Sequence, residues 1–265
     1  MIKALYLFSI FLFVITSALL LLLNIYGLFF KSLRSPGLYS HGKKINIKEF
    51  EQSAVRINGE SDKDFAARVT KLVHGVLTHI NWKKCNIEKY YLRIPPWENY
   101  ILFLLSYLPG DQIFKRYHFC NYLRTVERGI ANCADASIIL SHLLENNDMK
   151  VNIVAFPEHV MVEAKIDAKN DIRWVFDADL GVVLPYSIEK IIKNPALIVE
   201  HYIAAGCSKD RIGVIERTLA AKPKAFLDHF EFSPKRAIFE DISYALIWLI
   251  PIFLIAVSII IFERI

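Results

Sequence analysis

The most prominent pattern in the chain is a long run of apolar residues at each end. Residues 4–30 carry no charged side chain over 27 positions, and residues 242–262 form a second uncharged run of 21 residues that contains Pro251. A helix needs about 20 apolar residues to cross the ~30 Å hydrocarbon core of a bilayer, and it tolerates a proline as a kink. The pattern therefore predicts a transmembrane anchor in residues 1–34 and a second transmembrane helix in residues 241–265.

A cleaved signal peptide is the alternative interpretation of the N-terminal run. The apolar core of a signal peptide is shorter, roughly 7–15 residues, and it ends at a cleavage site made of small residues. The run over residues 4–30 is longer than that and lacks such a site. These differences favour a permanent membrane anchor.

Between the two runs, apolar spacing predicts one compact domain over residues 35–240. Helical spacing follows Ser61, and Asp64 lies three positions later, as in a capping box. Alternation of apolar and polar residues identifies strands further along the chain. The predicted elements are helices over residues 61–80 and 135–144, strands over residues 159–166 and 172–177, helices over residues 187–205 and 209–221, and a basic link over residues 222–241.

Two further segments have less regular patterns. Residues 31–46 are basic and contain proline and glycine, which predicts a linker. Tyr100–Leu108 is almost entirely apolar but too short to span a bilayer. It is predicted to be either a buried helix or an interfacial segment that places Trp97, Tyr100 and Tyr107 at the level of the lipid headgroups.

Cys133 lies in the first turn of the helix predicted over residues 135–144. The partial positive charge of a helix N-terminus stabilises a thiolate, which is the nucleophilic form of cysteine. A buried and unreactive thiol is the alternative for a cysteine considered alone. The reactive interpretation is favoured because the next two predicted strands carry a histidine and an aspartate.

His159 and Asp177 lie at the two ends of a predicted β-hairpin whose turn covers residues 167–171. Folding the hairpin about Ala168 sets position 159 opposite position 177, within side-chain reach. The carboxylate would then hold one imidazole nitrogen and leave the other for a thiol, as in a nucleophile–base–carboxylate triad. Asp179 is a second candidate carboxylate, but it lies beyond the predicted register.

These segments resemble the transglutaminase-like superfamily of papain-like cysteine enzymes over Ser61–Ile191. The strongest similarity is in residues 128–185, in the blocks RG (128–129), Cys133, HVMVE (159–163), Trp174 with Asp177, and DADLGVVLP (177–185). The last block is similar to a DxDxG version found in bacterial membrane and surface-polysaccharide-associated members. The resemblance implies an α+β fold in which the cysteine helix packs on an antiparallel sheet that carries the histidine and the aspartate.

By this resemblance, Cys133 is the nucleophile, His159 the general base and Asp177 the third catalytic residue. The implied reaction is attack on an amide or acyl bond through a Cys133 thioester. Water as the acceptor makes the protein a protease or amidase, and an amine makes it a crosslinking acyltransferase. The Cys133 amide is a natural oxyanion donor, and Asn132 or Asn121 is a candidate for the second donor. No cofactor is implied.

A non-catalytic protein that keeps this fold as a scaffold is the alternative from a different class. It would serve a membrane assembly, for example one that handles surface polysaccharide. The lipid bilayer is an expected partner in both cases, together with a protein or peptide substrate for the enzyme or an assembly partner for the scaffold. A metal site is not predicted, because His118, Cys120 and Cys133 lack the paired spacing of zinc ligands.

The net charge of +5 arises largely from lysine and arginine next to the apolar runs. We interpret it as attraction to lipid headgroups rather than to nucleic acid. The flanks on the domain side hold more of these residues than the short tails do, so the positive-inside rule places the domain on the cytoplasmic side of a bacterial inner or plasma membrane. The four cysteines show no pairing pattern, which fits a reducing compartment.

Overall fold

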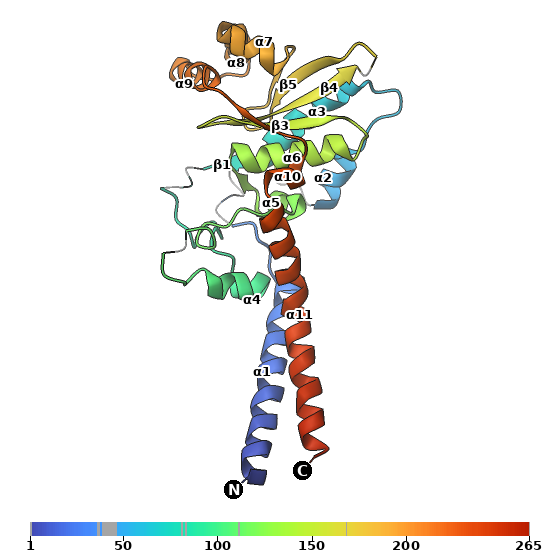
Figure 1. Ribbon diagram of the computed structural model, residues 1–265, viewed down its shortest axis with the longest axis vertical. Coiled ribbons are helices and arrows are strands. Elements are labelled where there is room, and N and C mark those ends of the chain that lie inside the picture. The colour runs from blue at the N-terminus through green and yellow to red at the C-terminus, as the bar shows by residue number, and fades with distance from the viewer. Residues whose placement is uncertain are drawn as a thin grey trace. The chain divides into compact units, whose positions relative to one another are not determined.

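The computed structural model of this protein has an α+β fold (Figure 1). It describes residues 2–35, 38, 47–80, 82, 84–110, 112–167 and 169–264. The chain divides into two compact units: a helical unit of Met1–Ser35, Asn86–His118 and Lys235–Ile265, and a sheet unit of Pro36–Cys85 and Phe119–Pro234. The predicted domain over residues 35–240 is thus interrupted by a segment that groups with the terminal helices.

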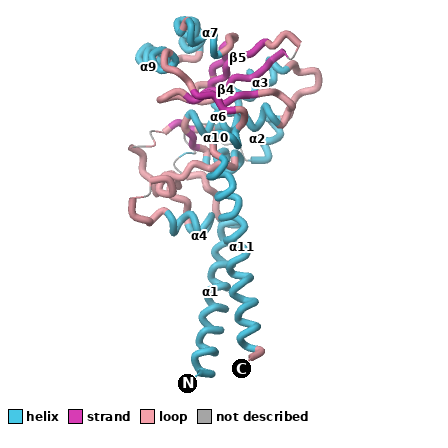
Figure 2. Tube along the Cα trace, in the orientation of Figure 1, coloured by secondary structure: helices cyan, strands magenta, loops and turns pink. Residues whose placement is uncertain are grey.

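The helical unit contains α1 (Ile2–Phe30), α4 (Pro96–Leu105) and α11 (Pro234–Phe262). Both α1 and α11 are long and apolar enough to cross a membrane. The two helices run side by side (Figure 2), and the Asn24 Nδ2 of α1 donates a 2.7 Å hydrogen bond to the Ile247 carbonyl of α11. Helix α11 begins well before the apolar run, because a helix can continue through charged residues outside that run and proline is favoured at its first turn.

The sheet unit is built on five antiparallel strands in the order β6-β5-β4-β3-β7. The strands are β3 (Val151–Ala155), β4 (Val160–Asp167), β5 (Ile172–Asp177), β6 (Val182–Leu184) and β7 (Lys224–Phe226). The sequence pattern predicted β4 and β5. Strand β7 lies inside the segment that was predicted to be a link over residues 222–241, so that prediction is wrong.

Helices cover both faces of this sheet (Figure 2). Val162 and Phe176 pack with α3 (Asp62–Val76) and α6 (Cys133–Glu145) on one face. Met161 and Val175 pack on the other face, against a layer formed by α7 (Ile188–Lys193), the short 3-10 helix η2 (Pro195–Ile198), α8 (Val199–Ala204) and α9 (Lys209–Leu219). The face of β4 predicted to be polar is therefore buried.

The helix boundaries agree with the sequence where a cap defines them. Ser61 caps α3 by accepting a 3.2 Å hydrogen bond from the Asp64 amide, as its capping-box spacing predicts. Helix α3 ends at Val76 instead of residue 80, because the chain then becomes extended and forms β1 (Thr78–His79). The helix predicted over residues 187–205 is interrupted at Pro195, which has no amide hydrogen to donate.

The remaining elements are α2 (Ile47–Ala54), α5 (Tyr122–Arg128), α10 (His229–Phe232) and β2 (Ile130–Ala131), which pairs with β1. Most of the linker predicted over residues 31–46 lies outside the described residues. The apolar segment Tyr100–Leu108 forms most of α4 and the turn after it, with Tyr100 and Leu102 buried and Leu104 and Leu108 exposed. The first part of the segment is thus buried, as predicted for a buried helix, and its end is exposed, which leaves the interfacial alternative open.

Candidate functional site

Helix α6 begins at Cys133 because the residue before it forms a complete capping box. The Asn132 side chain accepts a 3.0 Å hydrogen bond from the Asp135 amide, and the Asp135 carboxylate accepts a 3.3 Å bond from the Asn132 amide. Cys133 is thus the first helical residue, as predicted, and its thiol is partly exposed. The first amides of a helix have no intrahelical partner, so they direct a partial positive charge towards this position.

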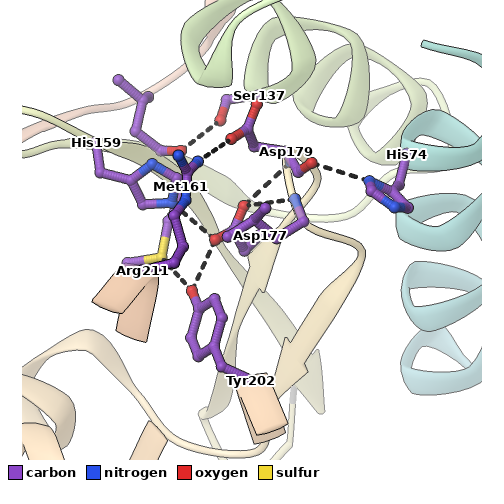
Figure 3. Close-up of polar contacts among 10 residues, drawn as sticks. His74, Ser137, His159, Met161, Asp177, Asp179, Tyr202 and Arg211 are labelled. Carbon is purple, nitrogen blue, oxygen red and sulfur yellow. Dashed lines mark hydrogen bonds and ion pairs between the residues drawn. The ribbon is translucent and has the colours of Figure 1, made fainter. Parts of the chain in front are cut away.

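A hydrogen bond between α6 and β4 brings the cysteine and the histidine together. The Ser137 hydroxyl donates a buried 3.1 Å bond to the carbonyl of Val160 (Figure 3). Ser137 lies one helical turn after Cys133 and so shares its face of α6. His159 directly precedes Val160. The single bond therefore holds the start of α6 against the start of β4.

His159 and Asp177 are in direct contact, although the predicted register is wrong. Strands β4 and β5 pair Val162 with Phe176, and continuing that register sets Asp177 opposite position 161. A fold about Ala168 would pair Asp167 with Lys169, whereas the hairpin pairs Asp167 with Ile172, and an irregularity between Lys165 and Asp167 takes back only one residue of this offset. Ala168 itself lies outside the described residues. The His159 Nε2 still reaches the Asp177 Oδ2 at 2.7 Å, because diagonal neighbours on paired strands are within reach of long side chains.

The surroundings of His159 favour its charged form. Burial acts in the opposite direction and lowers the pKa of this imidazole, since only 5% of the residue is exposed. The Asp177 charge, the hydrogen bond to Asp177 and the neighbouring Cys133 thiol together raise the pKa well above its usual value of 6.5. Because Nε2 is taken by Asp177, Nδ1 is the nitrogen left for the thiol. Glu158, the residue before His159, is exposed.

Asp177 is fully buried and receives four hydrogen bonds. Its Oδ2 accepts from the His159 Nε2 and, at 2.7 Å, from the hydroxyl of Tyr202. Its Oδ1 accepts from the amides of Asp179 at 3.0 Å and Leu180 at 3.2 Å. Burial raises the pKa of this carboxyl, but the His159 charge and these bonds outweigh burial and hold the pKa below its usual value.

Tyr202 is a member of the site that the sequence did not indicate. It lies on α8 and is completely buried, and its hydroxyl also lies 3.7 Å from the Met161 sulfur (Figure 3). Burial and the neighbouring Asp177 charge raise the pKa of Tyr202 well above its usual value, so it acts as a donor. The sequence around Tyr202 gives no local signal of this role, because its partner is 25 residues away in the sequence.

The loop after β5 holds Asp177 in place through contacts with α3 and α9. The His74 Nδ1 lies 2.9 Å from the carbonyl oxygen of Asp179, and the Asp179 carboxylate accepts a 3.2 Å bond from Arg211 (Figure 3). Gly181 has φ +68°, and a Cβ there would lie 3.0 Å from the His74 ring, so only glycine fits at this position. Asp179, the second candidate carboxylate, therefore pairs with Arg211, whereas Asp177 pairs with His159.

The two asparagines considered as oxyanion donors both act as helix caps. Asn132 caps α6, and the Asn121 side chain accepts hydrogen bonds from the amides of Leu123 at 3.0 Å and Arg124 at 3.4 Å at the start of α5. Capping uses the side-chain oxygen of each residue. Neither contact assigns an oxyanion donor.

The structure thus brings Cys133, His159 and Asp177 together in the order thiol, imidazole, carboxylate. The thiol is partly exposed, whereas the other two groups are buried behind it. A molecule that approaches this site would meet the sulfur first. No protein-family model, curated protein or solved structure matches the chain. A functional interpretation therefore depends on the geometry of the site.

Proposed function

We propose that this chain is a membrane-anchored cysteine enzyme of the transglutaminase-like kind, which attacks an amide or related acyl bond with Cys133. The observation that carries the proposal is the 2.7 Å hydrogen bond between His159 Nε2 and the buried Asp177 carboxylate, with the Cys133 thiol near enough to the imidazole to raise its pKa. A buried imidazole between a thiol and a carboxylate can exchange a proton with the sulfur while its other nitrogen stays fixed. A purely structural histidine has no need of a partly exposed thiol beside it.

The proposed reaction has two steps. The Cys133 sulfur, having passed its proton to His159, attacks the carbonyl carbon of the substrate. The His159 imidazolium then protonates the leaving amine as the carbon–nitrogen bond breaks, and a thioester remains on Cys133. In the second step His159 removes a proton from the acceptor, which attacks the thioester and releases the free thiol. Asp177 stabilises the imidazolium throughout.

Hydrolysis of a protein or peptide amide is the version of this reaction that we favour, because water is always present as an acceptor. Transfer to an amine would proceed by the same two steps and would crosslink or modify proteins. During attack, the substrate oxygen becomes negatively charged. The amide of Cys133 at the start of α6 is suited to stabilise that charge, since first-turn amides lack intrahelical partners.

Helices α1 and α11 supply the membrane anchor in this proposal. Each has the length and hydropathy of a transmembrane span, and most of each apolar stretch is exposed on the protein. A water-soluble protein rarely exposes an apolar surface of this size. With both ends of the chain anchored, the sheet unit would work close to a lipid surface, and the positive-inside rule favours the cytoplasmic side for it.

The test is the pH dependence of alkylation of the full chain in detergent by iodoacetamide, with each labelled cysteine identified by mass spectrometry. We expect Cys133 to react first and to remain reactive below about pH 7, where an unactivated thiol reacts slowly. The other three cysteines serve as internal references, and burial raises the pKa of the Cys207 thiol, which should label late. His159→Ala should abolish the preference for Cys133.

The matched control for this experiment is His201→Ala. His201 lies on α8 next to Tyr202, and its ring packs on Tyr186 rather than on Asp177. This substitution should leave the labelling of Cys133 unchanged. Slow and uniform labelling of all four cysteines in the unsubstituted chain would contradict the catalytic proposal and favour the non-catalytic scaffold.

A further inference from the structure

Three large apolar side chains of the helical unit are exposed at the end of α4. Leu104 is 64% exposed, Tyr107 58% and Leu108 52%. The turn after α4 continues with hydrogen bonds from the Tyr107 amide to the Leu104 carbonyl and from the Leu108 amide to the Leu105 carbonyl. The three side chains therefore have the spacing i, i+3, i+4 and share one side of the segment. We call them the exposed α4 face.

The first half of α4 is attached to α1 and α11. A Cβ at Gly27 of α1 would collide with the backbone carbonyl of Trp97, so the two backbones meet there without a side chain between them. The Asn99 Nδ2 donates a 3.0 Å hydrogen bond to the hydroxyl of Ser243 on α11. Asn99 and Ser243 are both buried, and these contacts give α4 a defined position along the two apolar helices.

A further attachment depends on Pro251. Proline has no amide hydrogen, so the carbonyl of Ile247, four residues earlier in α11, lacks its normal helical donor. That carbonyl instead accepts two hydrogen bonds, one from the Asn24 Nδ2 at 2.7 Å and one from the Tyr100 hydroxyl at 3.0 Å. Helices α1, α4 and α11 therefore meet at one backbone oxygen.

The position of this meeting point sets the depth of α4. Ile247 lies five residues inside the apolar run that begins at Ile242, which corresponds to ~7.5 Å along a helix. Asn24 lies six residues from Phe30, the end of the other apolar run, or ~9 Å. The two helices therefore give similar depths for the meeting point below the ends of their apolar runs. These depths match those of interfacial helices, which bury their apolar face about 5–10 Å into the boundary between headgroups and acyl chains.

The composition of the segment fits the same location. Residues 86–118 hold five of the chain's 12 tyrosines and one of its four tryptophans, and these two residue types are enriched at membrane–water interfaces. The guanidinium of Arg93 lies 4.3 Å from the centre of the Tyr107 ring. Arg93 also pairs with Glu88 at 2.8 Å, so the stacked guanidinium holds the Tyr107 ring in a fixed position.

We propose that the exposed α4 face is a membrane-docking surface. It lies in the acyl–headgroup boundary of the leaflet in which the apolar run of α1 ends, at Phe30, and that of α11 begins, at Ile242. This inference rests on the insertion of α1 and α11 in the membrane proposed above, but not on the chemistry of Cys133. Leu104 and Leu108 enter the outer part of the acyl chains, and Tyr107 with Arg93 lies at the headgroups. The occupant of this surface is lipid rather than a second copy of the chain.

The test places an environment-sensitive fluorophore (NBD) on single cysteines in a cysteine-free full chain, reconstituted into phosphatidylcholine vesicles. The positions are Leu104→Cys and Leu108→Cys on the exposed α4 face, Leu19→Cys in the middle of α1, and Ile203→Cys on α8. Leu19 reports insertion of the anchor, and Ile203 is a matched apolar position of the sheet unit, 54% exposed. Quenching by lipids that carry a nitroxide at a shallow or a deep acyl position measures the depth of each fluorophore.

We expect fluorophores at positions 104 and 108 to be quenched several-fold more strongly by the shallow nitroxide than by the deep one, with the reverse order at position 19 and little quenching at position 203. If the fluorophores at positions 104 and 108 are as little quenched as the one at position 203 while the one at position 19 is quenched, the docking proposal is wrong and the proposal of a membrane anchor stands. If position 19 is also unquenched, both proposals fail. Blue-shifted but unquenched emission at 104 and 108 would show a protein occupant and overturn the lipid assignment.

A second measurement covers the case in which removal of the cysteines impairs folding. A photoreactive benzoylphenylalanine replaces Tyr107 in the chain with its native cysteines, and the same residue replaces Ile203 as the control. Irradiation in vesicles should give a lipid adduct at position 107 and none at position 203. Crosslinks from position 107 to a second copy of the chain, without lipid adducts, would contradict the proposal.

Discussion

The two oxygens of the Asp177 carboxylate have different kinds of partner, and this difference defines how the residue is held. Backbone amides of the following loop bind Oδ1, so the loop sets where the carboxylate sits. The side chains of His159, just before β4, and Tyr202, on α8, bind Oδ2, so both contact the carboxylate charge. Tyr202 therefore competes with His159 for the same oxygen while it fixes the direction of that oxygen.

Replacement of Tyr202 by phenylalanine should reveal this positioning role. The change removes one hydrogen bond to a buried charge, which typically contributes about 1.5–3 kcal/mol to stability. Because that bond lowers the pKa of Asp177, its loss raises this pKa. The fall in the rate of Cys133 alkylation at low pH, which we call the acid limb, should therefore occur at higher pH. Tyr186→Phe, whose ring packs on His201, is the control. An unshifted acid limb in Tyr202→Phe would show that Tyr202 only fills space.

The shifts of His159 and Asp177 also predict how stability changes with pH. A raised histidine pKa contributes stability fully below about pH 6.5, and this is lost as the pH rises through the raised value. A lowered aspartate pKa contributes stability above about pH 3.8, and this is lost as the pH falls through the lowered value. The contribution of the pair is therefore greatest between these limits.

Thermal unfolding of the full chain in detergent measures this effect. We expect the difference in Tm between the unsubstituted chain and His159→Gln to be largest near pH 5 and to shrink as the solution becomes alkaline, because the imidazolium is then lost from the folded protein. His201→Gln provides the control for the loss of a histidine elsewhere. A Tm difference that does not vary with pH would mean that the pair is not ionised.

At the scale of elements, the site depends on how α6 and β4 are joined. The capping box decides where α6 begins, and the bond from Ser137 to the Val160 carbonyl decides where that beginning lies on the sheet. Hydrophobic packing of Ile138 on Ile153 supports the same contact. Packing alone would allow the helix to slide, since apolar contacts are not directional.

Ser137→Ala should therefore affect reactivity as well as stability. We expect a loss of about 1 kcal/mol in the free energy of unfolding, because the Val160 carbonyl loses a buried donor. We also expect slower alkylation of Cys133 near neutral pH, because α6 is less firmly held beside His159. Ser141→Ala is the matched control, since the Ser141 hydroxyl bonds only within α6, to Glu145 at 2.6 Å. Equal alkylation rates in the two variants would exclude a positioning role for Ser137.

At the scale of the whole molecule, segments distant in sequence build each compact unit. The helical unit joins the two ends of the chain with residues 86–118, and the sheet unit is made from the two stretches between them. Two membrane-spanning helices would place both termini on the same side of the bilayer. In the proposed arrangement, the positive-inside rule puts the sheet unit on the cytoplasmic side.

Topology reporters test this arrangement. A reporter fused after Ile265, and a second one fused before Met1, should both be active only in the extracytoplasmic compartment, because the termini then lie opposite the sheet unit. Activity of both reporters in the cytoplasm would reverse the orientation while keeping two spans. Opposite results at the two ends would mean that only one of α1 and α11 crosses the membrane.

Sequence by itself determined the features that local physics controls. The lengths of the apolar runs predicted two candidate spans, cap spacing predicted the start of α3, apolar spacing predicted α6, and alternation predicted β4 and β5. These signals are local because a helix cap or a strand pattern involves residues within a few positions of one another. They were sufficient to select Cys133, His159 and Asp177 as residues that would lie together.

Only the tertiary structure decided the features that depend on distant partners. The register of the β4–β5 hairpin was predicted incorrectly, because the hairpin pairs Asp167 with Ile172 and the apolar pattern does not fix the centre of a turn. The hydrogen bond from Tyr202 to Asp177 joins residues 25 positions apart, and the bond from Tyr100 to Ile247 joins residues 147 positions apart. No periodic pattern extends over such separations. A hydrogen bond between distant segments exists only once the chain has folded, and sequence spacing carries no record of it.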